Sequence, residues 1–184
     1  MKAKTVVKIR PETAGDIPAI HQVNVVAFGR SGEADLVDAL RQRGAYTLSL
    51  VAEKHGQVVG HILFTPVTIG PEMQGSAEDT MPQEVFTAVA LGPVAVLPDY
   101  QNQGIGAQLI GAGLAACHER GDDIVAVLGH PSYYPRFGFM PSVNVGVKSE
   151  YNVPDEVFMI TELRQGALAG RTGVVKYQPE FNEV

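Results

Sequence analysis

The sequence predicts a mixed α/β domain, and three observations support the prediction. Short β-branched runs alternate along the chain with segments whose apolar residues recur at helical spacing. Two apolar runs separated by a short turn are typical of an antiparallel hairpin. Further on, a strand, a helix and a second strand follow one another in the order that a parallel crossover requires. We therefore expect one sheet with both parallel and antiparallel neighbours.

The first third of the chain predicts the order strand, helix, helix, hairpin. The opening β-branched run ends at Pro11, which lacks a backbone donor. Gly29 and Gly44 each follow a segment of helical periodicity and end it. The dipeptide His55–Gly56 is the turn of the hairpin. The predicted elements are a strand at Thr5–Ile9, helices at Ile17–Phe28 and between Gly32 and Gly44, and hairpin strands at Leu48–Glu53 and Gln57–Val67.

The middle of the chain predicts a central strand with an irregularity. The run Val85–Val96 is apolar almost throughout, and Gly92–Pro93 inside it indicates a bulge or an interrupted ladder. The preceding segment Gly70–Gln83 has no periodicity and is a loop long enough to be functional. The remaining predicted elements are a largely buried helix from Ile105 to about Glu119 and strands at Ile124–Leu128, Val157–Glu162 and Gly173–Tyr177.

Composition excludes several classes of protein. The chain has 184 residues, which suits a single domain over residues 1–184 with a sizeable core. Its 14 basic and 20 acidic residues give a net charge of −6, so we expect no nucleic-acid partner. One cysteine, Cys117, excludes a disulfide framework. Because no apolar run suits a secretory signal or a membrane span, we expect a cytoplasmic protein without a membrane partner.

The segment Gln101–Gly106, at the start of the buried helix, is the most informative part of the chain. Gly104 and Gly106 each cost about 1 kcal/mol there relative to alanine, so they need a reason. Their backbone N–H groups can face an anion, and the helix N-terminus adds partial positive charge, which predicts a pyrophosphate cradle. Close packing of helix on sheet is the alternative reason. Leu109 stands where a dinucleotide-binding fingerprint needs glycine or alanine, and no P-loop lysine follows.

Two motifs in order carry a family resemblance. Gln101–Gly106 fits the pattern Gln/Arg-x-x-Gly-x-Gly/Ala, and Tyr134 stands four residues before the pair Gly138–Phe139. In these features the chain resembles the GNAT superfamily of acetyl-CoA-dependent N-acetyltransferases, and Gly129–Phe139 resembles a bacterial subgroup. The motifs span about Leu91–Phe139, the expected coenzyme-binding core. One departure is the short segment Gly129–Ser132, where many relatives carry an asparagine, so contacts of that asparagine are not carried over.

The resemblance implies a fold and a coenzyme site. The fold would be a central mixed sheet of about six to seven strands flanked by helices, with two parallel strands splayed apart at Gly92–Pro93. The pantetheine arm of acetyl-CoA would lie in the gap, and the glycine loop would bind the pyrophosphate through backbone amides. The coenzyme contacts carried over are Val94, Ala95, Val96, Gln101, Asn102, Gln103, Gly104, Ile105, Gly106, Ala107 and Tyr134.

The implied reaction is direct attack of a neutral primary amine on the thioester in a ternary complex. Tyr134 is the expected general acid for the leaving thiolate, and packing beside its aromatic neighbours is the alternative. For the base, Glu84 at the entrance to the central strand and Glu33 near the first helices are candidates, although each also suits a solvated surface charge. His130, just past a strand end, either contacts the acceptor or is a structural histidine before Pro131.

The same reasoning gives expectations about partners. Acetyl-CoA would be the cosubstrate, and no metal is expected, because the histidines lack ligand spacing. The acceptor would be a small-molecule or peptide amine selected by the first helices and the loop Gly70–Gln83, and the net charge mildly favours a cationic one. Arg136 either pairs with a coenzyme phosphate or lies at the surface. A homodimer is possible, and the alternative function is a non-catalytic acyl-CoA-binding or regulatory module.

Overall fold

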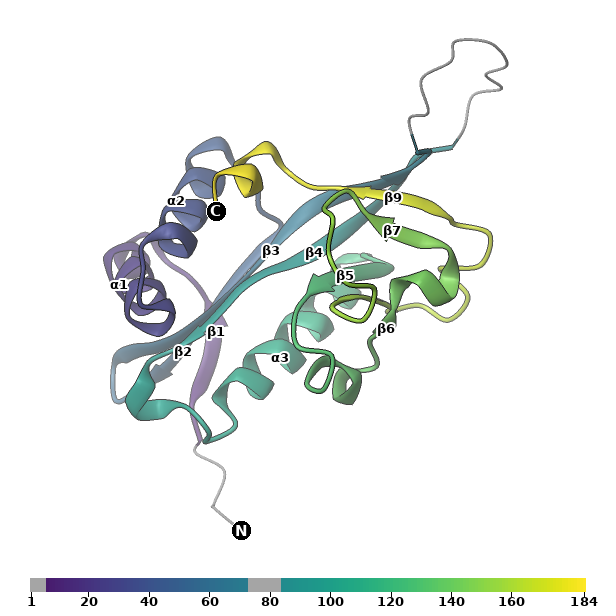
Figure 1. The fold of residues 1–184 in the computed structure, drawn as a ribbon. Coiled ribbons are helices and arrows are strands. Elements are labelled where there is room, and N and C mark those ends of the chain that lie inside the picture. Colours follow the sequence, from purple (N-terminus) through teal and green to yellow (C-terminus); the bar gives the residue numbers. More distant parts are fainter. Residues whose placement is uncertain (1–5, 73–83) are drawn as a thin grey trace.

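One nine-stranded mixed sheet organises the part of the chain that the computed structural model describes, residues 6–72 and 84–184 (Figure 1). Seven strands follow the order β1-β2-β3-β4-β5-β8-β6, and β9 pairs with both β3 and β7. The strands are β1 (Lys8–Pro11), β2 (Leu48–Lys54), β3 (Gln57–Gly70), β4 (Phe86–Val96), β5 (Ile124–Leu128), β6 (Met140–Pro141), β7 (Val147–Ser149), β8 (Phe158–Glu162) and β9 (Gly173–Lys176). The two strands that the sequence did not predict, β6 and β7, are two and three residues long, too short to show alternation.

Helices cover both faces of the sheet, and this explains the nearly continuous apolar character of its central strands (Figure 1). The helices α1 (Ile17–Phe28) and α2 (Gly32–Arg43) lie on one face and α3 (Ile105–Arg120) on the other. Ile62 and Phe64 of β3 share a core cluster with α3, whereas Leu63 between them packs with α1 and α2. A strand buried on both faces needs apolar residues at successive positions. Among the described residues, no helix is long and apolar enough to cross a membrane.

The structure confirms the predicted elements and shifts the bounds of two strands by more than one residue. One is β3, which runs to Gly70, three residues beyond its predicted end at Val67, and the other is β1. The bounds of α1 and β5 agree with the prediction, and the hairpin turn at His55–Gly56 has two positive φ angles, 50° and 77°. The first strand runs through Pro11, two residues beyond its predicted end. It is an edge strand, where the missing N–H of proline can face solvent. The strand begins only at Lys8, so Val6 and Val7, which were predicted to belong to it, do not, and the predicted start at Thr5 lies outside the described residues.

The predicted parallel pair consists of β4 and β5, which α3 connects. Their pairing extends only from Val89 with Val125 to Leu91 with Val127. Beyond Leu91, β4 pairs with β3 alone, while the end of β5 pairs with β8. The two parallel strands therefore diverge, as the resemblance implied.

A bulge in β4 begins where the two strands diverge. The register between β3 and β4 shifts there, so that Ile62 faces Val94 and Phe64 faces Leu91. Gly92 and Pro93 consequently lie opposite a single residue of β3. An extra residue in one strand of a pair bends that strand and strengthens its twist. The irregularity predicted at Gly92–Pro93 is thus confirmed.

Candidate active site

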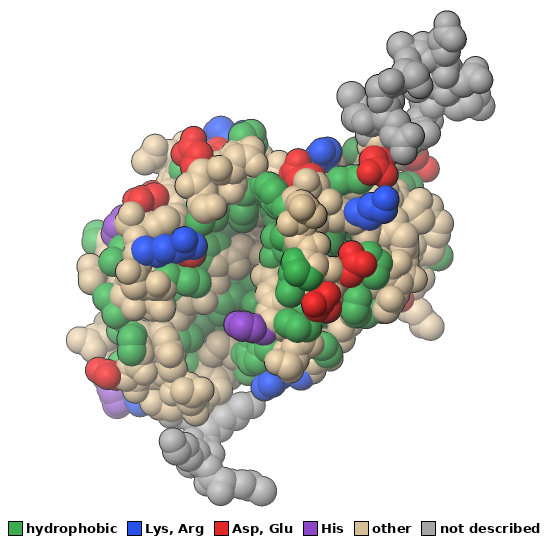
Figure 2. Space-filling model, in the orientation of Figure 1, with side chains coloured by type: hydrophobic (Ala, Val, Ile, Leu, Met, Phe, Trp, Pro, Cys, Tyr) green, Lys and Arg blue, Asp and Glu red, His purple; other side chains and the backbone are tan. Residues whose placement is uncertain are grey.

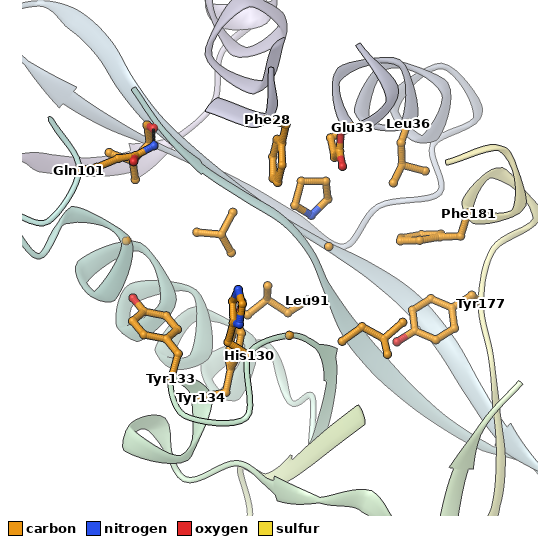
Figure 3. A pocket seen from close by; sticks show the side chains of 17 residues that line it. Phe28, Glu33, Leu36, Leu91, Gln101, His130, Tyr133, Tyr134, Tyr177 and Phe181 are labelled. Carbon is orange, nitrogen blue, oxygen red and sulfur yellow. Dashed lines mark hydrogen bonds between the residues drawn. The ribbon is translucent and has the colours of Figure 1, made fainter. Parts of the chain in front are cut away.

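A cleft of about 660 Å³ lies where β4 and β5 diverge, and Figure 2 shows a hollow, lined mostly by hydrophobic or uncharged groups, in the middle of this face. The bulged part of β4 contributes Gly92, Pro93 and Val94 to its lining. The end of β5 and the turn after it form one wall (Figure 3). The other wall comes from the first two helices and the C-terminal segment. The cleft thus joins segments that are far apart in the sequence.

A second cavity, of about 440 Å³, covers the start of α3. Val96, Gln101, Gly106 and Tyr133 line both this cavity and the cleft. The two spaces therefore adjoin along these residues, and together they extend from the helix N-terminus to the bulge in β4. An elongated ligand with an anionic end and a thin body suits such a path.

The two glycines of the loop serve different geometric needs. Gly104 is the N-cap of α3 and has a φ of 83°, a left-handed conformation that glycine adopts without strain. Gly106 has an ordinary helical position, but a Cβ there would lie 3.4 Å from the Tyr133 hydroxyl and narrow the cavity. The first-turn N–H groups of any helix lack intrahelical acceptors, and α3 has no acidic residue in that turn. The loop therefore fits an anion such as pyrophosphate.

Most of the coenzyme contacts implied by the resemblance line one of these two spaces, and two do not. Ala95 is fully buried, because β4 alternates and its neighbours Val94 and Val96 are the ones that face the cleft. The Gln103 side chain donates a 2.9 Å hydrogen bond to the Asp99 carbonyl, and this contact within the loop stabilises its conformation. Gln101 donates similarly to the Val96 carbonyl, at 2.9 Å, yet also lines both spaces.

Tyr134 belongs to a short 3-10 turn, Tyr134–Phe137, that follows β5 and lines the cleft (Figure 3). Its ring meets Tyr133 and Phe139 edge-on, with centroids 5.4 and 5.6 Å apart. A Cβ on Gly129 would lie 2.2 Å from the Tyr134 ring, so only glycine fits beneath it. Burial raises the pKa of Tyr134 to about 12, which keeps its hydroxyl protonated at neutral pH. Tyr134 is therefore both a packed aromatic and a hydroxyl at the cleft.

Of the two carboxylates considered as bases, the structure brings only Glu33 to the cleft. Glu33 lies in the first turn of α2, and Arg30 donates to it at 3.0 Å. The Glu33 side chain is 12% exposed and that of Arg30 63%, so the arginine lies on the outer side. Glu84 is exposed and precedes β4, and seven residues, roughly 23 Å of extended chain, separate it from Leu91. Glu84 precedes the first residue of β4, whereas the bulge lies in the second half of the strand, and Glu84 does not line the cleft.

His130 precedes the aromatic turn Tyr134–Phe137, and Arg136 lies within it. Figure 3 shows the His130 ring directed into the cleft from the segment after β5, and its carbonyl accepts a 3.0 Å hydrogen bond from the Tyr133 N–H. The residue is thus both a turn element and a cleft residue. Arg136 donates to the Tyr133 carbonyl at 3.0 Å, and its guanidinium lies 4.4 Å from the centre of the Tyr133 ring. It lines the cavity over α3, where a phosphate would lie.

The sequence did not predict the aromatic residues that the C-terminal segment contributes to the wall opposite β5. Tyr177 and Phe181 come from the C-terminal segment, and a Cβ on Gly92 would lie 3.9 Å from the tip of the Phe181 ring. In the sequence, the one feature that could have indicated this contact was Phe181, a single phenylalanine in an otherwise polar C-terminal stretch. The first helices, which were expected to border the acceptor, contribute Phe28 and Leu36 to the lining of the cleft. Most of the loop Gly70–Gln83, also expected there, lies outside the described residues.

Charged groups are sparse at the cleft. Among the described residues that line it, Glu33 is the only carboxylate, and neither lysine nor arginine is present. The net charge of −6 is therefore carried elsewhere on the chain. Within residues 6–72 and 84–184, no group of three or more His, Cys, Asp and Glu side chains is arranged to hold a metal ion.

The chain is similar to known acetyltransferases along most of its length. A family model described as "Acetyltransferase (GNAT) domain" matches residues 8–142. The "Uncharacterized N-acetyltransferase YhbS" of Escherichia coli K12 is 35% identical over 175 residues, which are 95% of this chain and 98% of that protein. The "Uncharacterized N-acetyltransferase YjhQ" of the same strain is 40% identical over 144 residues, 77% of this chain and 74% of that protein.

Two solved structures agree in fold with the whole sheet. The GNAT family N-acetyltransferase YhbS from Escherichia coli, in complex with CoA, has a TM-score of 0.84 and 34% identity, covering 96% of this chain and 92% of that chain. A GNAT family acetyltransferase from Brucella melitensis, in complex with acetyl-CoA, has a TM-score of 0.74 and 36% identity, covering 96% and 98% respectively. The mixed sheet with its parallel pair β4–β5 is thus shared with coenzyme-bound proteins.

Proposed function

This chain belongs to the GNAT family and is an acetyl-CoA-dependent acetyltransferase, and from that premise we propose that it acetylates a primary amine by direct attack in a ternary complex. The observation that carries the proposal is the path formed by the two adjoining spaces, from the start of α3 to the β4 bulge. A coenzyme lying along that path leaves the second wall of the cleft free for an acceptor. Both substrates can then be held at once, and no covalent enzyme intermediate is needed.

The glycine loop would hold the pyrophosphate of acetyl-CoA. Its support is the left-handed N-cap Gly104 together with the space above Gly106. The exposed edge of β4 beyond Leu91 would bind the pantetheine arm through backbone groups of Val94 and Val96, because β5 does not pair with this part of the strand. A backbone N–H there would stabilise negative charge on the thioester oxygen as the amine attacks.

Tyr134 would assist departure of the thiolate. The amine nitrogen forms a bond to the acetyl carbon, the carbon–sulfur bond breaks, and the sulfur gains a proton. With a pKa of about 12, Tyr134 is a weak acid, and full proton transfer to a thiolate of pKa about 8.5 costs roughly 5 kcal/mol. Its contribution is therefore a hydrogen bond donated to the developing thiolate. The proton that the nitrogen loses as the amide forms would pass to Glu33 or to water, and the released thiolate would take its proton from solvent.

Glu33 and His130 are the two side chains placed to receive the proton that the ammonium form of the acceptor must lose. They face the cleft from opposite walls (Figure 3). We assign Glu33 to hold the incoming ammonium group and to take its proton, directly or through water, and His130 to contact the acceptor from the other wall. In Glu33→Gln, kcat/KM for the amine should fall and the acidic limb of its pH profile should change, whereas His130→Gln should mainly raise KM.

Calorimetric titration with acetyl-CoA tests the coenzyme site. Gly106→Glu places a bulky anion in the cavity without straining the backbone, because Gly106 has an ordinary φ. We expect saturable binding by the native protein and loss of binding in this variant, since the anion would repel the pyrophosphate. The matched control is Gly111→Glu, which adds the same charge to α3 at an exposed position with nothing within 4 Å of its Cβ. If both variants bind acetyl-CoA like the native protein, the coenzyme site is elsewhere.

Tyr134→Phe tests the role of the hydroxyl. The ring packing against Gly129 is retained, so the fold and the affinity for acetyl-CoA should stay as they are. Turnover, measured as thiol release with a saturating amine, should fall by about 10²-fold, the lower range for positioned proton donors. Unchanged turnover would remove Tyr134 from the mechanism.

A further inference from the structure

The acetyl transfer proposed above leaves the acceptor undefined, and the cleft defines its class. We infer that the acceptor is a monoamine carried on an apolar body of about the size of an aromatic ring. The inference rests on the proposed function, because it concerns the wall of the cleft opposite the coenzyme path.

The acceptor wall is built from apolar side chains of three separate elements. Phe28 ends α1, Leu36 lies in α2, and Tyr177 and Phe181 belong to the C-terminal segment (Figure 3). Phe28 is 40% exposed, and Leu128 on the facing side is 38% exposed. An apolar ligand removes this exposed apolar surface from water, which favours its binding, whereas beside a polar ligand the surface stays in contact with water.

The Phe181 ring lies directly beside the reacting end of the proposed coenzyme path. It is within 3.9 Å of the Cβ position of Gly92, the first residue of the bulge. Tyr177 and Phe181 also contact each other, with ring centroids 5.1 Å apart. An apolar body that extends from the attacking nitrogen would therefore meet these rings at once.

The C-terminal segment is held in place from outside the cleft. Arg43 forms an ion pair with Glu180 and donates to the Gln178 side chain, and Gln178 donates a 2.7 Å hydrogen bond to the Pro66 carbonyl. These contacts fix the short turn Pro179–Glu183 that bears Phe181. The aromatic wall is thus formed before any ligand binds, which reduces the entropic cost of binding.

The charges at the cleft suit a single positive group. Glu33 is its one carboxylate among the described residues, and it also pairs with Arg30, which is 63% exposed and does not line the cleft, so at most one further positive group finds a carboxylate there. A polyamine or an aminoglycoside carries several ammonium groups, and each one buried without a carboxylate would lose solvation without compensation. One ammonium group near Glu33 and an uncharged body against the rings match what the wall offers. An acceptor with one ammonium group is compatible with the cationic acceptor that the net charge of −6 mildly favours.

The test compares three amines with acetyl-CoA at saturation, with thiol release as the readout. We expect kcat/KM for 2-phenylethylamine to exceed that for methylamine and that for spermidine by at least about tenfold, because apolar pocket contacts discriminate by this order. Equal or better turnover of spermidine or methylamine would overturn the inference and leave the acetyltransferase proposal intact. Binding of acetyl-CoA without acetylation of 2-phenylethylamine would also overturn it. Failure to bind acetyl-CoA would instead contradict the proposed function.

Substitutions in the wall separate recognition from a general loss of structure. Phe181→Ala and Phe28→Ala should each lower kcat/KM for 2-phenylethylamine about tenfold or more while changing that for methylamine less than about threefold. A purely structural defect would lower both values together, and this outcome in both variants would overturn the assignment. The matched control is Val26→Ala. Val26 lies in α1 like Phe28 and is 39% exposed, but it does not line the cleft. It should leave both values unchanged.

Discussion

At the scale of single residues, the position of Tyr134 depends on a neighbour that has no side chain. Gly129 follows the last residue of β5, and its N–H donates a 2.9 Å hydrogen bond to the Val157 carbonyl. The Tyr134 ring lies so close that a Cβ on Gly129 would be 2.2 Å from one ring carbon and 2.7 Å from another. The contact involves a ring wedged among other aromatics, so it cannot relax as a flexible chain end would. Gly129 therefore fixes the position of the Tyr134 ring through the space that it leaves for it.

Gly129→Ala should displace the Tyr134 ring and lower turnover in an acetyl-CoA and amine assay by about tenfold or more, because small displacements of a catalytic group are costly. Acetyl-CoA affinity should change little, since the loop Gln101–Gly106 is unaffected. The informative comparison is the double variant with Tyr134→Phe. If Gly129 acts through Tyr134, the double variant should lose no more activity than Tyr134→Phe alone. Additive losses would show that Gly129 acts by another route.

At the scale of elements, α3 connects the parallel strands and presses directly on the sheet. Gly113 faces β3, and a Cβ there would lie 2.4 and 2.7 Å from two carbons of the Phe64 ring. Phe64 is fully buried, so it has little room to move. Gly111, two residues earlier, is exposed and has nothing within 4 Å of its Cβ position. The sequence places both glycines in the helix, but only Gly113 is required by packing.

The two glycines of α3 should respond to alanine with opposite signs. Gly113→Ala should lower the free energy of unfolding by about 1–3 kcal/mol, because the added methyl overpacks the core. Gly111→Ala should raise it by up to about 1 kcal/mol, because alanine favours the helix and glycine does not. Urea denaturation of the two variants beside the native protein measures both. Equal effects of the two substitutions would mean that α3 does not lie against Phe64.

At the scale of the whole molecule, a network of buried and half-buried polar groups connects the first two helices to the hairpin of β2 and β3. Arg41 of α2 donates a 2.9 Å hydrogen bond to Glu12, and Ser49 of β2 donates to the same carboxylate. His61 of β3 lies 2.9 Å from the Ser49 hydroxyl through Nε2 and 3.2 Å from the Asn24 amide through Nδ1. Since Asn24 donates to Nδ1, His61 must be the neutral Nε2–H tautomer.

The pKa of His61 is lowered to about 3, chiefly because burial disfavours the charged ring. In the unfolded chain a histidine takes up a proton near pH 6.5. Below that pH the unfolded state binds more protons than the folded state, so stability is present above pH 6.5 and is lost as the pH falls toward 3. We expect the free energy of unfolding to fall between pH 6 and 5 with a slope approaching about 1.4 kcal/mol per pH unit.

His61→Gln should abolish this slope between pH 6 and 5, although it lowers stability overall by removing a buried partner. The range from pH 6 to 5 is chosen because protonation of Glu12 lowers the stability only at lower pH. Burial raises the pKa of Glu12, but hydrogen bonds from Arg41 and Ser49 outweigh it and bring the pKa below its ordinary value. The contribution of Glu12 is therefore lost only on further acidification. A native protein whose stability is constant from pH 6.5 to 5 would contradict the neutral buried His61.

The sequence by itself determined the order of the elements and the loop at Gln101–Gly106. These features are local: a period of apolar residues, a glycine after a helix or a Gly–Pro pair in a strand acts on its neighbours within a few residues. The helix Ile17–Phe28, the strand Ile124–Leu128 and the bulge in β4 could therefore be predicted. The short strands β6 and β7 could not, because pairing alone makes them strands.

Only the tertiary structure decided which side chains share the cleft. Glu33 and Glu84 carry the same group and were equal candidates in the sequence, but the sheet places one at the cleft and the other at the far end of β4. Phe181 reaches Gly92 because the C-terminal turn is held against α2, a contact between residues far apart in the chain. Such contacts depend on how the sheet twists and what closes over it, and no local pattern encodes their outcome.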